Sequence, residues 1–274
     1  MDKLHFNNFF KAKPVIGMLH FPPLPGSPDY DEQSGVDGIL KWVEKDLEVL
    51  QDNGVDAVMF GNEADRPYLL KADAATVAAM AYVIGRLSSK LRVPYGVDVL
   101  WDPEATVSLG ASVGAKFVRE VFTGLYASDM GVWNRAAGRA QRLRRYLCAN
   151  QMLMFYNINA EFASSVDSRE IAVIAKSVEF SSKPDAICIS GGMTGSPPDL
   201  ETLRRVKDAV RTTPIIMNTG VTPANVGQVL EVVDGVIVGT ALKVDNNTWA
   251  AVDPSRVAAL MRAAREARGT SSAG

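Results

Sequence analysis

The stretch Gly54-Val55-Asp56-Ala57-Val58-Met59-Phe60-Gly61-Asn62 shows in one place how this chain is built. A tight turn of small and polar residues leads into an apolar run from Ala57 to Asn62, which lacks the alternation expected of a strand with one exposed face. Related turns precede three later apolar runs: Pro184-Asp185-Ala186-Ile187, Val233-Asp234-Gly235-Val236 and, more loosely, Gly114-Ala115-Lys116-Phe117. We interpret these turns as scaffold that connects a helix to the next buried strand.

Short apolar runs recur along the whole chain. They are rich in Val, Ile and Phe, and most are continuous enough to be buried on both faces of a sheet. The predicted strands are Pro14–His20, Ala57–Asn62, Pro94–Leu100, Phe117–Val121, Met152–Ile158, Ala186–Gly191, Ile215–Gly220 and Gly235–Thr240.

Longer amphipathic stretches follow these runs in turn. The predicted helices are Gly35–Gln51, Asp73–Leu91, Pro103–Val113, Trp133–Cys148, Arg169–Phe180, Asp199–Val210, Pro223–Val232 and Pro254–Arg265. Eight strands that alternate with eight helices in about 260 residues predict an α/β fold, a single (β/α)8 TIM barrel. The competing fold, a doubly wound open sheet, would need fewer strands or a glycine-rich fingerprint after the first one.

The same pattern sets the expected domain organisation. We expect residues 14–268 to form the barrel, after an N-terminal extension of residues 1–13 and before a disordered tail of residues 269–274. Three helix starts place a capping oxygen just before a first-turn proline: Asp102-Pro103, Thr222-Pro223 and Asp253-Pro254.

Composition excludes some classes of protein. The 274 residues include 29 basic and 31 acidic ones, a net charge of −2, which argues against binding to nucleic acid or to an anionic membrane. Cys148 and Cys188 are too few for a disulfide framework or a cysteine metal cluster, and we expect reduced thiols in a cytoplasmic protein. No apolar run reaches about 18 residues, so we expect no membrane span. A homo-oligomer is compatible with the sequence.

Polar residues stand where the predicted strands end. In a (β/α)8 barrel the active site forms at the carboxyl ends of the strands, where polar side chains need partners. These residues are His20, Asn62, Glu63, Asp98, Arg119, Glu120, Asn157, Asn159, Ser190, Asn218, Thr219 and Thr240. Each alone has a structural explanation, such as a turn cap or a loop hydrogen bond. Together they predict a ligand site at the mouth of the barrel.

Glycine and hydroxyl residues follow the last three strands. Barrels commonly bind phosphate after the seventh and eighth strands, where glycines let backbone amides approach an anion. The predicted phosphate-binding residues are Ser190, Gly191, Gly192, Gly220, Thr222, Gly239 and Thr240. The alternative interpretation is that the glycines only permit tight turns.

Carboxyl groups mark the opposite half of the predicted mouth. Glu63, Asp98 and Glu120, with His20 after the first strand, are the candidate catalytic acids and bases. Asp98 and Glu120 lie on adjacent strands and could share a proton or a divalent metal ion. The histidine spacing does not suit a zinc site. A Schiff-base lysine is not expected, because Lys116 and Lys243 lie outside the predicted strand ends.

With these residues identified, the chain resembles the BtpA/SgcQ family of (β/α)8 barrels over about residues 13–265. The matching stretches are Pro14–His20 with Pro23–Gly26, Gly54–Phe60, Gly114–Arg119, Thr219–Thr222, and Val238–Thr240 with Leu242-Lys243. The likeness is greater to the SgcQ branch, in Asn62-Glu63, Gly96–Pro103 and Arg119–Asp129. That branch implies a carbohydrate enzyme, whereas the founding BtpA member implies a photosystem assembly factor.

The chain departs from the common BtpA pattern at the predicted site. It has Gly61-Asn62-Glu63-Ala64-Asp65 where a Glu-Asn-Phe-Gly-Asp run is usual, and Asp98 where asparagine is usual.

Two functional hypotheses follow from these features. The first is an enzyme that acts on a phosphorylated sugar or a phosphoribosyl-type compound, with Asn62, Arg119, Asn157, Asn159 and Asn218 binding the substrate. Isomerisation, epimerisation and carbon–carbon cleavage all use proton transfer next to a carbonyl group. The second is a BtpA-like assembly or ligand-binding protein without catalytic activity.

Overall fold

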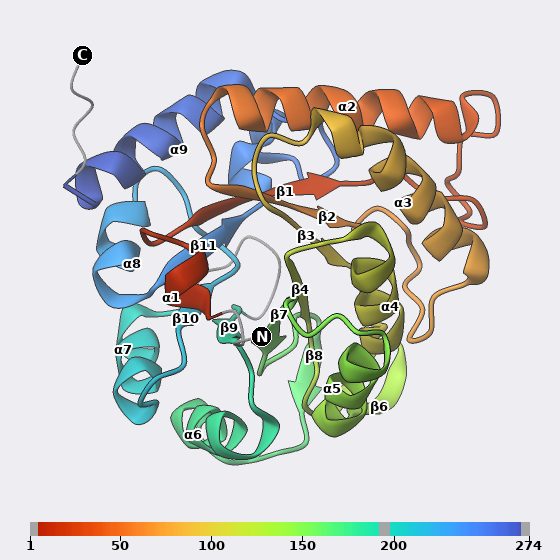
Figure 1. The fold of residues 1–274 in the computed structure, drawn as a ribbon. Coiled ribbons are helices and arrows are strands. Elements are labelled where there is room, and N and C mark those ends of the chain that lie inside the picture. The colour runs from red at the N-terminus through yellow and green to blue at the C-terminus, as the bar shows by residue number, and fades with distance from the viewer. Residues whose placement is uncertain (1–4, 192–197, 270–274) are drawn as a thin grey trace.

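A computed structural model describes residues 5–191 and 198–269 of the chain (Figure 1). Its centre is a closed barrel of parallel strands in the order β1-β11-β10-β9-β7-β4-β3-β2. The strands are β1 (Val15–His20), β2 (Ala57–Gly61), β3 (Tyr95–Asp98), β4 (Phe117–Glu120), β7 (Leu153–Asn157), β9 (Ala186–Ile189), β10 (Ile215–Met217) and β11 (Gly235–Val238).

Helices form a ring around this barrel, and the predicted (β/α)8 fold is confirmed (Figure 1). They are α2 (Gly35–Asp52), α3 (Ala74–Leu87) with the 3-10 turn η1 (Ser88–Lys90), α4 (Pro103–Val113), α5 (Ala137–Tyr146), α6 (Ile171–Ser182), α7 (Leu200–Ala209), α8 (Val226–Val232) and α9 (Pro254–Ala267). The ring packs closely on the barrel at Gly110 of α4, where an added Cβ atom would lie 2.6 Å from Val118 Cγ1 of β4, and at Gly17 of β1, where it would lie 2.9 Å from Leu50 Cδ2 of α2. Interlocked apolar faces of this kind hold the ring on the barrel.

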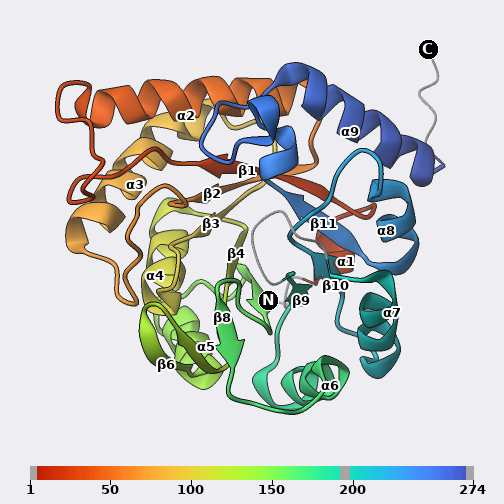
Figure 2. The same ribbon diagram turned by 180° about the vertical axis from the view of Figure 1, so that it is seen from behind.

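A short helix closes one end of the barrel. In α1 (Phe6–Phe9) and the residue after it, Phe6 and Phe10 are buried. Their rings lie 5.7 Å from Phe155 and 6.2 Å from Phe117, both of which point into the barrel. Figure 1 shows α1 in front of the barrel and Figure 2 shows it behind, so the segment covers the amino ends of the strands. Residues of the N-terminal extension therefore complete the barrel core.

A second, three-stranded sheet lies at the other end, over the mouth (Figure 2). It contains β5 (Gly124–Ser128), β6 (Gly131–Arg135) and β8 (Ala163–Ser165). The predicted helix Trp133–Cys148 is wrong at its start, because Trp133 belongs to β6 and α5 begins at Ala137. The reason is a hairpin: Gly131 turns with a φ of 91°, and Trp133 pairs with Tyr126 across the strands.

Two of the three predicted helix caps are confirmed. Asp102 accepts hydrogen bonds from two first-turn amides of α4, and Asp253 does the same for α9. The prediction for Thr222 is wrong, because α8 begins only at Val226. The Asn225 side chain instead accepts from the Thr222 amide at 2.8 Å and donates to the Gly220 carbonyl at 2.9 Å, which holds this segment in a turn.

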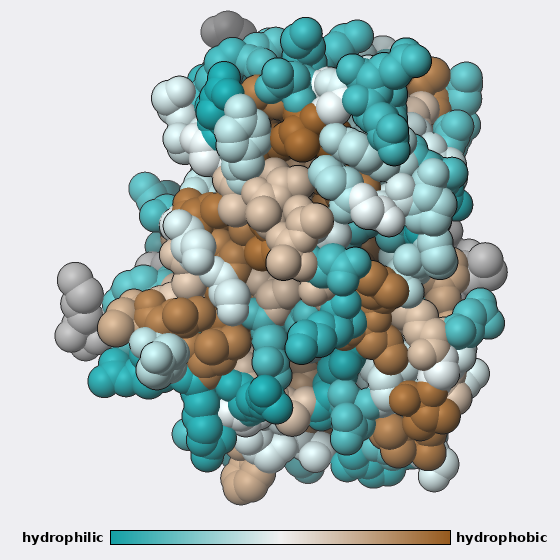
Figure 3. All heavy atoms as spheres, turned by 90° about the vertical axis from the view of Figure 1, so that its right-hand side faces the viewer, coloured by the Kyte–Doolittle hydropathy of each residue, from teal (hydrophilic) through white to brown (hydrophobic). Residues whose placement is uncertain are grey.

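The outer surface is mixed in character. Figure 3 shows the face over α3 and α4, where hydrophilic residues surround several hydrophobic patches. Large exposed apolar side chains include Tyr82 on α3, Tyr146 on α5 and Phe180 on α6. No helix among residues 5–191 and 198–269 has the length and apolar character needed to cross a membrane.

Candidate active site

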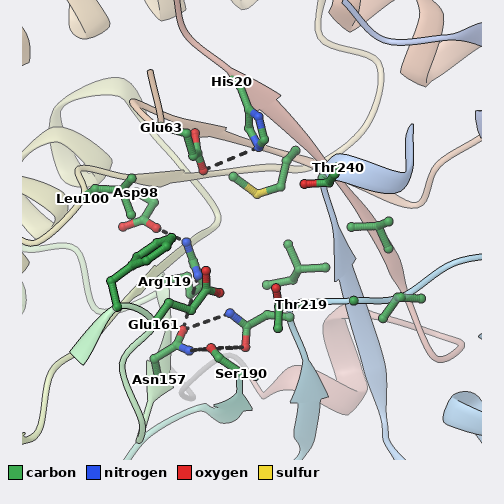
Figure 4. A pocket seen from close by; sticks show the side chains of 18 of the residues that line it. His20, Glu63, Asp98, Leu100, Arg119, Asn157, Glu161, Ser190, Thr219 and Thr240 are labelled. Carbon is green, nitrogen blue, oxygen red and sulfur yellow. Dashed lines mark hydrogen bonds and ion pairs between the residues drawn. The ribbon is translucent and has the colours of Figure 1, made fainter. Parts of the chain in front are cut away.

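The carboxyl ends of the strands surround a cavity of about 290 Å³. Figure 4 shows side chains from β1, β3, β4 and β7 converging on this space, together with Glu63 from the loop after β2. The sequence-predicted residues that line it are His20, Glu63, Asp98, Arg119, Glu120, Asn157, Asn159, Ser190, Asn218, Thr219, Gly220, Thr222, Gly239 and Thr240. Strand ends far apart in the sequence thus contribute to one site.

A buried ion pair lies in the wall of the cavity. Arg119 Nη2 donates to Asp98 Oδ2, and both side chains are almost fully buried. The hydrogen-bond pattern favours the Asn218 orientation in which its amide oxygen accepts from Arg119 Nη1 at 2.9 Å. Burial lowers the pKa of Arg119, but the charges of Asp98, Glu161 and Glu63 more than offset this and raise the pKa above its ordinary value. The guanidinium is therefore a permanent positive charge.

Three carboxyl groups around this pair have raised pKa values. Burial, with the charge of Asp98, raises the pKa of Glu63 to about 8 and that of Glu120 to about 8. Burial also raises the pKa of Asp98 to about 6, although Arg119 opposes this shift. Near neutral pH, Glu63 and Glu120 are mainly protonated and Asp98 is mainly ionised. Acids that titrate close to the working pH can both donate and accept protons.

Several buried polar atoms in the cavity lining have no hydrogen-bond partner among the described residues. They are Glu63 Oε2, Asp98 Oδ1, Trp101 Nε1, Arg119 Nε and Glu120 Oε2. Leaving such atoms unpaired costs free energy, so buried polar groups in proteins are normally hydrogen-bonded. Their concentration in the lining of one cavity is typical of a site that receives a polar ligand.

His20 stands at the edge of this group. Its Nδ1 atom lies 3.2 Å from the Thr248 carbonyl, which fixes the proton on Nδ1 and leaves Nε2 as an acceptor. Nε2 lies 3.7 Å from Glu63 Oε1. Burial and the charge of Lys243 lower the pKa of His20 to about 3. His20 is therefore neutral and a weak base, and its unprotonated Nε2 atom faces the Glu63 carboxyl group.

Amide side chains organise the floor of the cavity. Asn157 Nδ2 donates to Ser190 Oγ at 2.5 Å, and Ser190 Oγ in turn donates to the Asn218 amide oxygen at 3.1 Å. Asn159 holds the Ser190 peptide from both sides, since it accepts from the amide at 3.0 Å and donates to the carbonyl at 2.6 Å. This network links the ends of β7, β9 and β10.

The glycine-rich side of the cavity follows β10 and β11. Gly220 has a φ of 71°, a left-handed conformation that favours glycine. Gly239 is pressed against His20, because an added Cβ atom would lie 3.0 Å from His20 Nε2. Thr240 opens the 3-10 turn η2 (Thr240–Leu242), and its hydroxyl contacts that of Thr248 at 2.8 Å. The Thr222 amide already donates to the Asn225 side chain, so Thr222 would contact a ligand through its hydroxyl group.

Some predicted residues lie elsewhere. Asn62 is behind the cavity wall, where its side chain accepts from the Leu100 amide at 2.7 Å and so ties two loops together. Gly191 precedes the segment 192–197 and is not part of the lining. Gly192 lies outside the described residues.

Several lining residues were not predicted. Tyr68, Trp101 and Glu161 line the cavity from loops after β2, β3 and β7. The sequence carries one usable signal for them, the Leu100-Trp101-Asp102-Pro103 segment directly after a strand. Trp101 has a φ of 65°, a strained conformation for a bulky residue and one that is often found at functional sites.

No group of three or more His, Cys, Asp or Glu side chains is placed to hold a metal ion within the described part of the chain. Asp98 already gives one oxygen to Arg119, and Glu120 Oε1 accepts from the Trp101 amide at 3.0 Å. Lys243, the nearest lysine in sequence to the mouth, is buried in an ion pair with Asp46 at 2.8 Å. The polar groups that the predicted site residues bring to the cavity wall are thus carboxyl, guanidinium, imidazole, amide and hydroxyl groups.

Comparisons with known proteins agree with this architecture. A family model described as the BtpA family matches residues 11–266. The sgc region protein SgcQ of Escherichia coli strain K12 is 44% identical over 91% of this chain and 93% of its own. The photosystem I biogenesis protein BtpA of Synechocystis is 31% identical over 95% of this chain and 91% of its own.

A solved structure shares the fold at low sequence identity. The N-acetylmannosamine-6-phosphate 2-epimerase of Clostridium perfringens matches with a TM-score of 0.55 and 12% identity, over 88% of this chain and 92% of its own. At this identity the likeness concerns the barrel alone.

Proposed function

The chain belongs to the BtpA family, and from this membership and the cavity described above we propose that it is an enzyme that acts on a phosphorylated sugar or a phosphoribosyl-type compound by acid–base chemistry. One observation carries the proposal. A permanently charged Arg119 lies among buried carboxyl groups that titrate near neutral pH and keep unpaired oxygen atoms in the same cavity.

These groups are suited to proton transfer next to a carbonyl group. An ionised Glu63 or Glu120 takes a proton from the carbon beside the carbonyl, and the electron pair moves onto the carbonyl oxygen. Arg119 is placed to stabilise the resulting enolate oxygen, since its charge acts in a site of low dielectric constant. Return of a proton to the opposite face of the same carbon gives an epimer. If the proton of the adjacent hydroxyl group moves to the enolate oxygen, return of a proton to the former carbonyl carbon gives an isomer, with the new carbonyl group on the neighbouring carbon.

The glycine-rich side is proposed to hold the phosphate group. Ser190, Gly220, Thr222, Gly239 and Thr240 line that side of the cavity, after the strands where barrels of this fold bind phosphate. The Clostridium perfringens epimerase, which has the same fold, is named for a sugar-phosphate substrate. A role in carbohydrate metabolism, which the resemblance to the SgcQ branch implies, is part of this proposal.

An assembly or stability factor is the alternative, and the name of the Synechocystis relative favours it. Such a protein would use its surface and would have no need of unpaired carboxyl oxygens in a cavity at the barrel mouth. If strains with Asp98→Ala and Glu120→Ala kept the wild-type phenotype while the protein folded normally, this alternative would replace the enzyme proposal.

A thermal-shift screen tests the proposal. The purified protein is heated with pentose and hexose phosphates, with the same sugars unphosphorylated, and with or without Mg²⁺, Mn²⁺ or Zn²⁺. A ligand that binds the folded state stabilises it by about 2.7 kcal/mol at 100 times its Kd. We expect stabilisation by a phosphorylated sugar only, followed by deuterium uptake into that sugar in D₂O, and loss of deuterium uptake in Glu120→Gln. Absence of stabilisation by every phosphorylated sugar would contradict the proposal.

A further inference from the structure

A second cavity of about 270 Å³ lies beside the first, at the same end of the barrel. Its walls come from the segments after β1, β2 and β11, which are 21–23, 64–66 and 248–250. His20 lines both cavities. The second cavity therefore adjoins the candidate active site directly.

The partition between the two cavities is thin. It contains the His20 ring and the Thr248 segment, joined by the contact of His20 Nδ1 with the Thr248 carbonyl at 3.2 Å. Thr248 also contacts Thr240, a proposed phosphate-side residue, through their hydroxyl oxygens at 2.8 Å. A ligand that occupies both cavities would have to pass the His20 ring and the Thr248 segment.

Apolar side chains that contain rings make up much of the lining of this cavity. Pro22 and Pro23 line it together with two indole rings, Trp42 and Trp249. The two tryptophans are 39% and 44% exposed, although large aromatic side chains are normally covered. Flat rings around a concave space are suited to stacking on a planar ligand.

One cation accompanies these rings. The Arg66 guanidinium carbon lies 4.0 Å from the centroid of the Trp249 ring, a cation–π contact. Among residues 5–191 and 198–269, no carboxylate forms an ion pair with Arg66. The neighbouring Asp65 faces the other way, since it accepts from the Thr76 hydroxyl at 3.1 Å and from the Leu24 amide at 3.4 Å. The cavity thus has a positive charge without an internal counterion.

We propose that the second cavity binds a planar aromatic or heteroaromatic group attached to the sugar phosphate held in the first cavity, with an acceptor or anionic edge of that group facing Arg66. This inference rests on the proposed function, because the sugar and the aromatic group belong to one ligand. It names the substrate class as a sugar phosphate that carries an aromatic substituent.

Three related compounds test binding to the two cavities separately. Ribose 5-phosphate, adenosine and 5′-AMP are titrated into the full-length protein by calorimetry, since AMP carries a planar base on the same sugar phosphate. We expect AMP to bind about tenfold more tightly than ribose 5-phosphate, which is the usual gain from one stacked base. In Trp249→Ala and in Arg66→Met this ratio falls toward one while the Kd of ribose 5-phosphate stays within about twofold. Trp249→Phe keeps part of the gain, and Phe180→Ala, an exposed ring on α6, leaves the ratio unchanged.

The possible outcomes distinguish a failure of the second-cavity inference from a failure of the proposed function. If AMP binds no more tightly than ribose 5-phosphate, or if the ratio survives in both variants, the second-cavity inference is wrong and the proposed function stands. If ribose 5-phosphate does not bind but adenosine binds in a Trp249-dependent manner, the aromatic cavity is supported and the sugar-phosphate proposal fails. If neither AMP nor adenosine binds, the inference is overturned.

Discussion

Glu120 illustrates how a single buried residue makes the stability of this protein depend on pH. Its carboxyl group is 2% exposed, and burial together with the charge of Asp98 raises its pKa from 4.5 to about 8. The folded state therefore binds a proton that the unfolded state releases between these values. The stabilisation is complete below about pH 4.5 and is lost as the pH rises through 8.

The variant Glu120→Gln tests this dependence, because glutamine resembles the protonated acid. We expect the variant to match the wild type near pH 5 and to exceed it at pH 9 by a few kcal/mol in the free energy of unfolding, in proportion to the pKa shift. Urea titrations between pH 5 and 9 measure the difference. Glu201→Gln, an exposed position on α7, is the control and should follow the wild-type curve. Parallel curves for wild type and Glu120→Gln would show that Glu120 is ionised throughout.

At the same scale, the sequence predicts most of the cavity wall. Asp98, Arg119 and Asn157 were identified because polar residues at the ends of buried strands must converge in a closed barrel. Asn62 fails the same rule, since a short polar side chain after a strand can equally bind a neighbouring loop, here the Leu100 amide. The sequence pattern does not distinguish a side chain that faces the cavity from one that binds a loop, because the difference depends on the local backbone conformation after the strand.

The small three-stranded sheet at the mouth is the element that was not predicted from the sequence. Its strands are short, and Trp133 continues into a region of helical periodicity, so the end of β6 from Trp133 was assigned to a helix. The inner face of the sheet carries Tyr126 and Trp133, whose rings lie 4.6 Å apart, and Trp133 packs on Trp101 at 5.9 Å. Arg135 adds a hydrogen bond to the Trp101 carbonyl at 2.6 Å. The sheet thus holds the strained residue that contributes to the cavity.

Removal of one inner ring tests this coupling. Tyr126→Ala leaves a void beside Trp133 and removes the hydrogen bond from the Tyr126 hydroxyl to the Ile158 carbonyl. We expect a loss of a few kcal/mol in local stability, seen as faster amide hydrogen exchange over residues 124–135 with β1 and β2 unchanged. Leu125→Ala, on the exposed face of the same strand, provides the matched comparison. Equal exchange in the two variants would mean that the inner ring does not support the sheet.

At the scale of the whole molecule, the barrel follows from the sequence because eight buried runs alternate with eight amphipathic ones. The position of the N-terminal segment does not follow, since four helical residues have no periodicity to interpret. Phe6 and Phe10 pack inside the barrel against residues of strands that are distant in the sequence. Tertiary packing of this kind is invisible to local patterns.

The contribution of that segment is measurable. We expect Phe6→Ala to lower the free energy of unfolding by about 3 kcal/mol, because it removes a ring packed on Phe155 and leaves a cavity. Asn7→Ala, exposed on the same short helix, should change it little. Urea denaturation of both variants gives the comparison. A loss of less than about 0.5 kcal/mol for Phe6→Ala would show that the barrel is stable with that end open.

The sealed end of the barrel also determines how the molecule can be handled. His5 begins the described chain at that end, and Arg268, near its close, binds Asp56 at the amino end of β2 at 2.8 Å. A surface tether attached near His5 or Arg268 would therefore lie at the amino end of the barrel. The two cavities at the opposite end would face away from the point of attachment.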